Sequence, residues 1–217
     1  MDQILRTGTR PSRLAIKQVE EISSLLPDLL FKVITIETKG DRDKATPLPA
    51  LEGTDFFTHE IEEALLAGWI DLGIHSAKDL EESSPDGLII AATTASVSPH
   101  DCLVSGRGET LKTLAPGSVV GTSSAKRKEA IRKFRKDLIV KDIRGEIDER
   151  LQQLDRGDFD AIIVAHAALL RLGYETRIAE IIPEYIIEPH PLQGKLAIQI
   201  RRDRTDLADI FRRIDAN

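Results

Sequence analysis

The chain has 217 residues, 41% of them hydrophobic, which suffices for one large globular domain or two small ones. It carries 36 acidic and 30 basic residues, and its net charge of −6 makes the surface as a whole a poor match for nucleic acid or anionic lipid. A single cysteine, Cys102, excludes an internal disulfide and a metal site built on several cysteines.

Two features argue against a membrane or secreted protein. No apolar run approaches the roughly 18 residues that a membrane helix needs, and the first residues lack the basic and then apolar layout of a signal peptide. We therefore expect a cytoplasmic protein, with neither a membrane nor a nucleic acid as partner. A monomer is a separate expectation. The five histidines show no metal-ligand spacing, so no metal is expected.

The N-terminal part of the chain alternates between strand and helix. Residues 4–9 predict a strand, and Ser12 then caps a helix whose apolar residues recur at helical spacing as far as Leu26. Residues 31–36 are rich in β-branched side chains and predict the next strand. Residues 41–53 carry charges, two prolines and a glycine without periodicity, which is typical of a long, mobile loop that serves a site.

The same alternation continues along the chain. A helix face that begins at Phe57 stops at Gly68, and a short buried strand follows at 71–74. The linker-like stretch 93–100 indicates a domain boundary. This pattern predicts an α/β fold of parallel sheets covered by helices, with binding groups at strand ends and helix starts. Further strands are predicted at 88–92, 101–104, 119–121, 138–140 and 161–164.

The segment from His75 to Asp79 is dense in chemical groups. It places an imidazole, a hydroxyl, a cation and a carboxylate directly after an apolar strand. A carboxylate beside Lys78 can stay ionised, accept hydrogen bonds from N–H groups and stabilise a cationic intermediate. The alternative is a polar strand end that merely meets solvent, and this segment alone does not decide between the two.

Three strand-to-helix junctions have the composition of anion sites. At 121–127, hydroxyls, backbone N–H groups and two cations meet at a helix start. At 143–150, two arginines flank a turn, and a guanidinium can hold a carboxylate through two bonds. Residues 9–12 repeat the pattern. The alternatives are a solvated basic helix face and surface ion pairs with Glu146 or Glu149, but three junctions together indicate one polyanionic ligand.

Eight segments, in order, resemble the hydroxymethylbilane synthase (porphobilinogen deaminase) family over nearly the whole chain. Any one of them is a weak signal, but eight in the family's order make chance resemblance unlikely. The segments are Thr9–Ser12, Thr38–Asp41, Phe57–Glu62, His75–Leu80, Gly121–Arg127, Ile143–Arg150, Ala165–Gly173 and Pro191–Ile198.

This resemblance implies a transferase of haem biosynthesis that condenses four porphobilinogen molecules into hydroxymethylbilane and releases ammonia at each addition. It implies that Asp79 is the catalytic carboxylate, which stabilises the positive charge that develops as the amine leaves. It also implies a set of residues that bind the substrate or the cofactor: Arg10, Ser12, Phe57, His75, Ser76, Lys78, Thr122, Ser123, Ser124, Lys126, Arg127, Arg144, Gly145, Arg150 and Gln193.

The resemblance further implies two domains similar to periplasmic binding proteins, with a cleft between them. Domain 1 is expected at residues 1–95 and 193–217, and domain 2 at 96–192. The family continues into a third domain, whose cysteine carries a covalent dipyrromethane cofactor. This sequence ends before that domain, and Cys102 does not match the attachment cysteine. We therefore expect a chain without the third domain, either truncated or naturally short.

Three positions depart from the family. Thr54 and Lys126 stand where the family has a lysine and an arginine, and Glu146 replaces an asparagine beside Arg144, which would weaken carboxylate binding. Because the cysteine domain is missing, a non-catalytic tetrapyrrole- or anion-binding protein is the alternative function. A substrate-binding protein for transport is suggested by the fold alone and opposed by the absent signal peptide.

Overall fold

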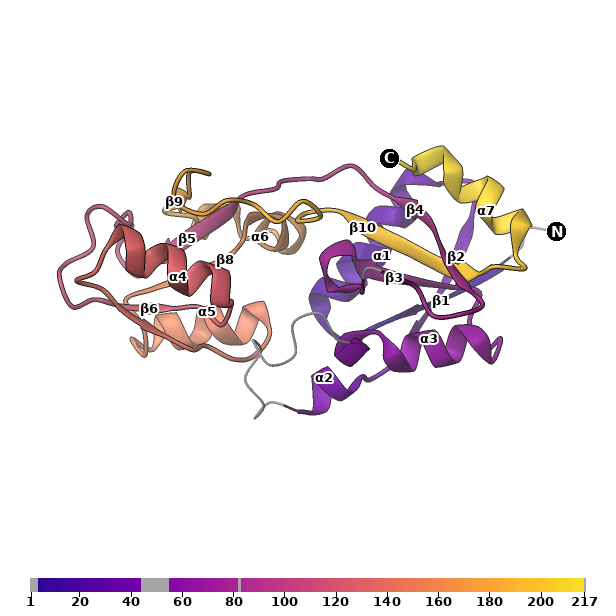
Figure 1. Ribbon diagram of the computed structural model, residues 1–217, viewed down its shortest axis with the longest axis horizontal. Coiled ribbons are helices and arrows are strands. Elements are labelled where there is room, and N and C mark those ends of the chain that lie inside the picture. The colour runs from indigo at the N-terminus through magenta and orange to yellow at the C-terminus, as the bar shows by residue number, and fades with distance from the viewer. Residues whose placement is uncertain (1–3, 44–54, 82, 217) are drawn as a thin grey trace. The chain divides into compact units, whose positions relative to one another are not determined.

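The computed structural model in Figure 1 describes residues 4–43, 55–81 and 83–216. Most of the loop expected at 41–53, and Thr54, lie outside these described residues. The chain forms two compact units, each of which is described by itself. Unit 1 takes its described residues from Met1–Asp43, Glu52–Val97 and Lys195–Asn217, and unit 2 from Ser98–Gly194.

Unit 1 is built on a mixed sheet of five strands. They are β1 (Ile4–Thr9), β2 (Leu30–Thr35), β3 (Leu72–Ser76), β4 (Leu88–Thr93) and β10 (Leu196–Arg201). Their order is β2-β1-β3-β10-β4. The first three are parallel, whereas β10 runs antiparallel between β3 and β4.

The position of β10 shows that the expectation of purely parallel sheets is wrong. The chain leaves unit 2 at Gly194, and Leu196, the first residue of β10, pairs with Ser76, the last residue of β3. A strand that enters a sheet where its neighbour ends must run back along that neighbour, so the pairing is antiparallel. Five successive residues of β10 are buried, so both faces of this strand are covered.

Helices of unit 1 pack on two apolar clusters. α1 (Arg13–Leu25) and α7 (Thr205–Phe211) contribute to one cluster with β3 and β10, whereas α3 (His59–Leu66) contributes to the other. Ser12 caps α1, since its Oγ accepts a hydrogen bond from the Ala15 N–H at 3.2 Å. The remaining helical turns are α2 (Lys39–Arg42), η2 (Asp55–Phe57), η3 (Ala77–Asp79) and η5 (Arg212–Ile214).

Unit 2 is a second mixed sheet of five strands. They are β5 (Asp101–Ser105), β6 (Val119–Gly121), β7 (Ile139–Lys141), β8 (Ala161–Ala165) and β9 (Glu180–Ile181). In the order β7-β6-β8-β5-β9, β6 is parallel to both of its neighbours, and β5 is antiparallel to both of its own. β5 is antiparallel for the same reason as β10. Its first residue, Asp101, pairs with Ala165, the last residue of β8.

Helices of unit 2 also pack on two apolar clusters. α4 (Ala125–Phe134) buries Ile131 in one cluster, and α5 (Ile147–Asp155) buries Leu151 and Leu154 in the other. α6 (His166–Leu172) buries Leu169 beside α5 and is followed by the turn η4 (Glu175–Arg177).

Two details of unit 1 differ from expectation. Phe57 lies in η2, before α3 begins at His59, so it is not on the helix face. Asp71 precedes β3, and its carboxylate accepts the Arg6 N–H and pairs with the Arg6 guanidinium at 2.9 Å. Within the described part of the chain, every helix is too short or too polar to span a membrane.

Candidate functional site

In each unit the expected site residues lie at one edge of the sheet. β1 and β3 are parallel neighbours, so Arg10 and the segment 75–79 follow strands that end at the same edge. β6 and β7 likewise end together, and the segments 122–127 and 143–150 follow them. The first residue of β5, Asp101, pairs with the last residue of β8 and joins that edge. The topology therefore gathers residues that are far apart in the sequence.

The turn that carries Lys78 and Asp79 is fixed on both sides. The Ser76 Oγ accepts a hydrogen bond from Gln18 Nε2 of α1 at 2.9 Å, and the Ala77 N–H donates to the Lys195 carbonyl at 3.0 Å. Asp79 ends η3 and is half-buried. Among the residues that the structure describes, none donates a hydrogen bond to its carboxylate or forms an ion pair with it. The Asp79 carboxylate is thus positioned by the backbone and keeps its acceptor oxygens for a ligand.

His75 is buried beneath this turn, on the face of the sheet that α3 covers. A Cβ at Gly73 would lie 2.9 Å from His75 Nε2 and 2.9 Å from Ile61, so only a glycine leaves room for the ring. Burial lowers the pKa of His75 to about 4, the neighbouring Gln199 side chain opposes this shift, and the positive charge of Arg10 adds to it. A neutral, buried ring supports the strand end, and the contact of His75 with the substrate stays a prediction.

This buried histidine should make stability depend on pH. The unfolded state takes up a proton near pH 6.5, whereas the folded state resists it until about pH 4, so the free energy of unfolding falls as pH drops through this window, by up to about 3 kcal/mol. Urea unfolding of the wild type and of His75→Gln at pH 7 and pH 4.5 measures the difference. An equal pH dependence in the two proteins would contradict the assignment.

Arg10 and Ser12 lie at the junction between β1 and α1. The Ser12 hydroxyl caps α1, and its contact with the substrate stays a prediction. The Arg10 guanidinium pairs with Asp41 and lies over the Phe57 ring, 4.5 Å from its centroid. The structure therefore brings together Arg10 and Phe57, which we predicted as site residues, and adds Asp41, which we did not.

Three hydroxyl side chains follow β6, and they differ in whether they make hydrogen bonds within the protein. Ser123 Oγ bonds to the Ile143 carbonyl and accepts the Ile143 N–H at 3.2 Å, which ties this junction to the one after β7. Ser124 is the N-cap residue of α4 but makes no capping bond through its side chain. Thr122 Oγ1 is buried without a hydrogen-bond partner among the described residues. Two of the three predicted hydroxyls thus remain for a ligand.

Arg127 is held by an internal carboxylate. Its Nε and Nη2 donate to the two oxygens of Asp101 at 2.8 and 2.6 Å, and both side chains are almost fully buried. Gln193 Nε2 donates to the same carboxylate at 2.8 Å and to the Pro99 carbonyl at 2.9 Å. Arg127 and Gln193 are therefore already hydrogen-bonded within the protein, in a network that also anchors the beginning of β5. Their binding of a ligand stays a prediction.

Positive charge is concentrated beside this network. The pKa of Arg150 is lowered to about 10, first by burial and then by the charges of Arg127 and Arg144. Arg150 Nε donates to the Gly145 carbonyl at 2.8 Å. Gly145 has φ +103°, and a Cβ there would lie 2.5 Å from Glu149 Oε2, so this turn requires glycine. Gly145 thus fixes the turn, and its contact with a ligand stays a prediction. The charges of Arg127 and Arg144 disfavour the charge of Arg150, and an anionic ligand would relieve this repulsion.

The two described departures from the family pattern lie at the rim of this cluster. Lys126 is half-exposed and lies 3.4 Å from the exposed Glu188 carboxylate. Glu146 is the N-cap residue of α5, where its backbone N–H donates to Glu149 Oε2 at 2.8 Å.

Cys102 is enclosed by the core of unit 2. Cys102 is fully buried in β5, and burial raises the pKa of its thiol to about 12, so it is neither accessible nor nucleophilic. Among the described residues, no group of three or more histidine, cysteine or acidic side chains could hold a metal ion.

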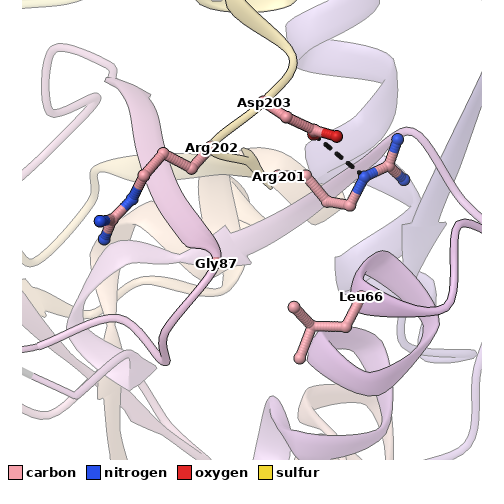
Figure 2. A pocket seen from close by; sticks show the side chains of 5 residues that line it. All are labelled: Leu66, Gly87, Arg201, Arg202 and Asp203. Carbon is pink, nitrogen blue, oxygen red and sulfur yellow. Dashed lines mark hydrogen bonds and ion pairs between the residues drawn. The ribbon is translucent and has the colours of Figure 1, made fainter.

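A surface hollow of unit 1 lies away from these residues. Leu66, Gly87, Arg201, Arg202 and Asp203 line it, and Figure 2 shows Arg201 turned toward Asp203. Because Leu196 pairs with Ser76, Arg201 lies at the opposite end of the antiparallel pair from the segment 75–79. The hollow is therefore separate from the candidate site.

The main residues that sequence reasoning missed are buried acids and amides. Asp41 and Asp101 hold the predicted arginines, and Gln199 donates to Glu62 at 2.9 Å behind His75. Burial raises the pKa of Glu62, although the Gln199 bond opposes the shift. An acid at the start of an apolar strand, as at Asp101, was the signal available in the sequence.

Two α/β units with polar groups at their strand ends define a protein of the periplasmic-binding-protein type. The chain aligns with a putative methionine-binding lipoprotein from Bacillus subtilis (TM-score 0.58, 11% identity, 99% of this chain and 91% of that one). It also aligns with a periplasmic substrate-binding protein of an ABC transporter from Coxiella burnetii (TM-score 0.57, 13% identity, 97% and 91%). Likeness at this identity shows the fold alone.

Sequence comparisons identify the family within this fold. Residues 5–209 match the family described as "Porphobilinogen deaminase, dipyromethane cofactor binding domain". The chain is 41% identical to porphobilinogen deaminase of Thermus thermophilus over 211 residues, 95% of this chain and 68% of that protein. It is 42% identical to that of Chromobacterium violaceum over 216 residues, 97% and 69%. The chain belongs to the porphobilinogen deaminase family, as its motifs predicted.

Proposed function

We propose that this chain condenses porphobilinogen head to tail into hydroxymethylbilane, with release of ammonia, in tetrapyrrole biosynthesis. The observation that carries the proposal is the Asp79 carboxylate, which is held at the end of β3 beside Lys78 and makes no hydrogen bond or ion pair with the described residues. A carboxylate with open acceptor oxygens suits a substrate that brings pyrrole N–H groups and becomes cationic during the reaction.

The role of Asp79 is electrostatic. As the C–N bond of the substrate's protonated aminomethyl group breaks, the electron pair leaves with the nitrogen, which departs as ammonia, and positive charge spreads over the pyrrole. Asp79 accepts the pyrrole N–H and stabilises that charge. A carbon of a second pyrrole then forms the new C–C bond and loses its proton, which restores the aromatic ring.

The charges of unit 2 fit the carboxylates of both the substrate and the dipyrromethane cofactor. Burial and the charges of Arg127 and Arg144 lower the pKa of Arg150, and the Thr122 hydroxyl is buried without a partner among the described residues. Acetate and propionate groups would satisfy both features. The cofactor, when bound, is the primer of the condensation. Cys102 does not fit as its attachment point, because its thiol is fully buried.

We also propose that porphobilinogen is the partner of this chain and that nucleic acid is not. The net charge of −6 favours this assignment, because a chain that is acidic overall is a poor match for nucleic acid. We further propose that the protein acts in the cytoplasm as a monomer.

The test is incubation of the purified chain with porphobilinogen, with ammonia and linear tetrapyrrole measured together. We expect four ammonia molecules for each tetrapyrrole. Binding of porphobilinogen without ammonia release would instead favour a non-catalytic binding protein.

A further inference from the structure

Arg10 is held on two of its sides. Its Nε donates to Asp41 Oδ1 at 3.0 Å, and its Nη2 pairs with the same oxygen. One face of the guanidinium lies on Phe57, 4.5 Å from the ring centroid. Among the described residues, its third nitrogen, Nη1, has no hydrogen-bond partner. A guanidinium gripped in this way presents a defined edge rather than a mobile charge.

Asp41 is itself fixed. Its second oxygen, Oδ2, accepts the Thr38 N–H at 3.0 Å and the Thr38 hydroxyl at 2.9 Å, and Thr38 is fully buried at the start of α2. Burial raises the pKa of Asp41, but hydrogen bonds from Arg10 and Thr38 outweigh it and lower the pKa overall. One carboxylate oxygen thus anchors Asp41 to α2, and the other orients Arg10.

Gly40 completes the arrangement. A Cβ at this position would overlap the Phe57 ring, so the absent side chain is what lets the ring lie under Arg10. The Arg10 guanidinium is therefore held by the Asp41 carboxylate and by the Phe57 ring, for which Gly40 leaves room.

We infer that Asp41 is a positioning residue for substrate binding: it orients Arg10 over Phe57 so that the Nη1 edge receives a carboxylate of porphobilinogen. The inference rests on the proposed function and deepens it. Asp41 is not a competitor that the substrate displaces, because it touches Arg10 through one oxygen only and is fastened to Thr38 through the other.

The test is Asp41→Asn, which keeps the shape of the side chain and removes its charge. We expect KM for porphobilinogen to rise about tenfold with little change in kcat, because the oriented contact is made equally in the ground state and the transition state. The Arg10 Nε–H signal in NMR spectra should lose its protection from solvent exchange. An unchanged or lowered KM in the folded variant would overturn the inference.

Two further variants separate positioning from general damage. Gly40→Ala displaces Phe57 but leaves the carboxylate, and it should raise KM about threefold. Asp28→Asn removes an exposed carboxylate of unit 1 that pairs with Arg213, and it should leave KM unchanged. If Asp28→Asn raised KM as much as Asp41→Asn, the effect would be one of overall charge and the inference would be wrong.

The inference and the proposed function can fail separately. Absence of ammonia release by the wild type would reject the proposed function. Isothermal titration calorimetry with porphobilinogen measures binding without turnover. Roughly tenfold weaker binding by Asp41→Asn in that titration would still support the positioning role, and equal binding would reject it.

Discussion

Replacing Asp79 by asparagine is expected to lower kcat for ammonia release by about 10²–10³-fold and to leave the fold intact. Asparagine has nearly the same shape but no negative charge, so the stabilisation of the developing cation is lost. The backbone bonds that hold η3, including the one from Ala77 to Lys195, do not involve the side chain. Steady-state kinetics and thermal unfolding of the two proteins measure both parts of this expectation.

The matched control is Asp86→Asn, which removes an exposed carboxylate of the same unit. It should retain wild-type kcat. If Asp79→Asn kept more than about a tenth of the wild-type rate, electrostatic stabilisation by Asp79 would not be the main source of catalysis.

Replacing Asp101 by alanine should have the largest effect on stability. Arg127 and Gln193 would lose their shared acceptor, and a guanidinium that is only 13% exposed would be left without its counter-charge beside two other arginines. Removing one partner of a buried pair costs about 3–5 kcal/mol. Hydrogen exchange of β5 and β8 amides reports the free energy of opening of unit 2 without interference from unit 1.

Asp158→Ala provides the comparison for this prediction. Asp158 pairs with Arg156 at 3.0 Å, but both side chains are about half-exposed, so the loss should stay below about 1 kcal/mol. Equal protection of the β5 amides in Asp101→Ala and wild type would show that the Asp101 network contributes little to stability.

The sequence indicates which polar segments follow strands, but it does not show the contacts that their side chains make. The reason is the distance along the chain between contacting residues. Periodicity and strand-end polarity are local signals, and they located the segment 75–79 and the junctions after β6 and β7. The acids that hold the arginines are 31 residues from Arg10 and 26 from Arg127. Only the folded topology brings such residues together, so residue type alone could not separate a cation open to ligand from one already paired.

The same limit applies to Ser12, Ser123 and His75, whose contact with a ligand stays a prediction. In the structure the first caps a helix, the second ties two junctions together and the third is buried and neutral. Their burial depends on α1, β7 and α3, whose positions are tertiary properties. The predicted cleft and domain limits likewise stay predictions about how the chain is organised.

The place of β10 in unit 1 has a consequence for how the protein is made. This strand lies inside the sheet, between β3 and β4, but it follows every residue of unit 2 in the sequence. During synthesis the whole of unit 2 emerges before unit 1 can close its sheet, and until then β3 and β4 each present an unpaired edge. The described residues of unit 2 are contiguous and emerge together, whereas unit 1 must wait for a strand that comes more than a hundred residues after β4.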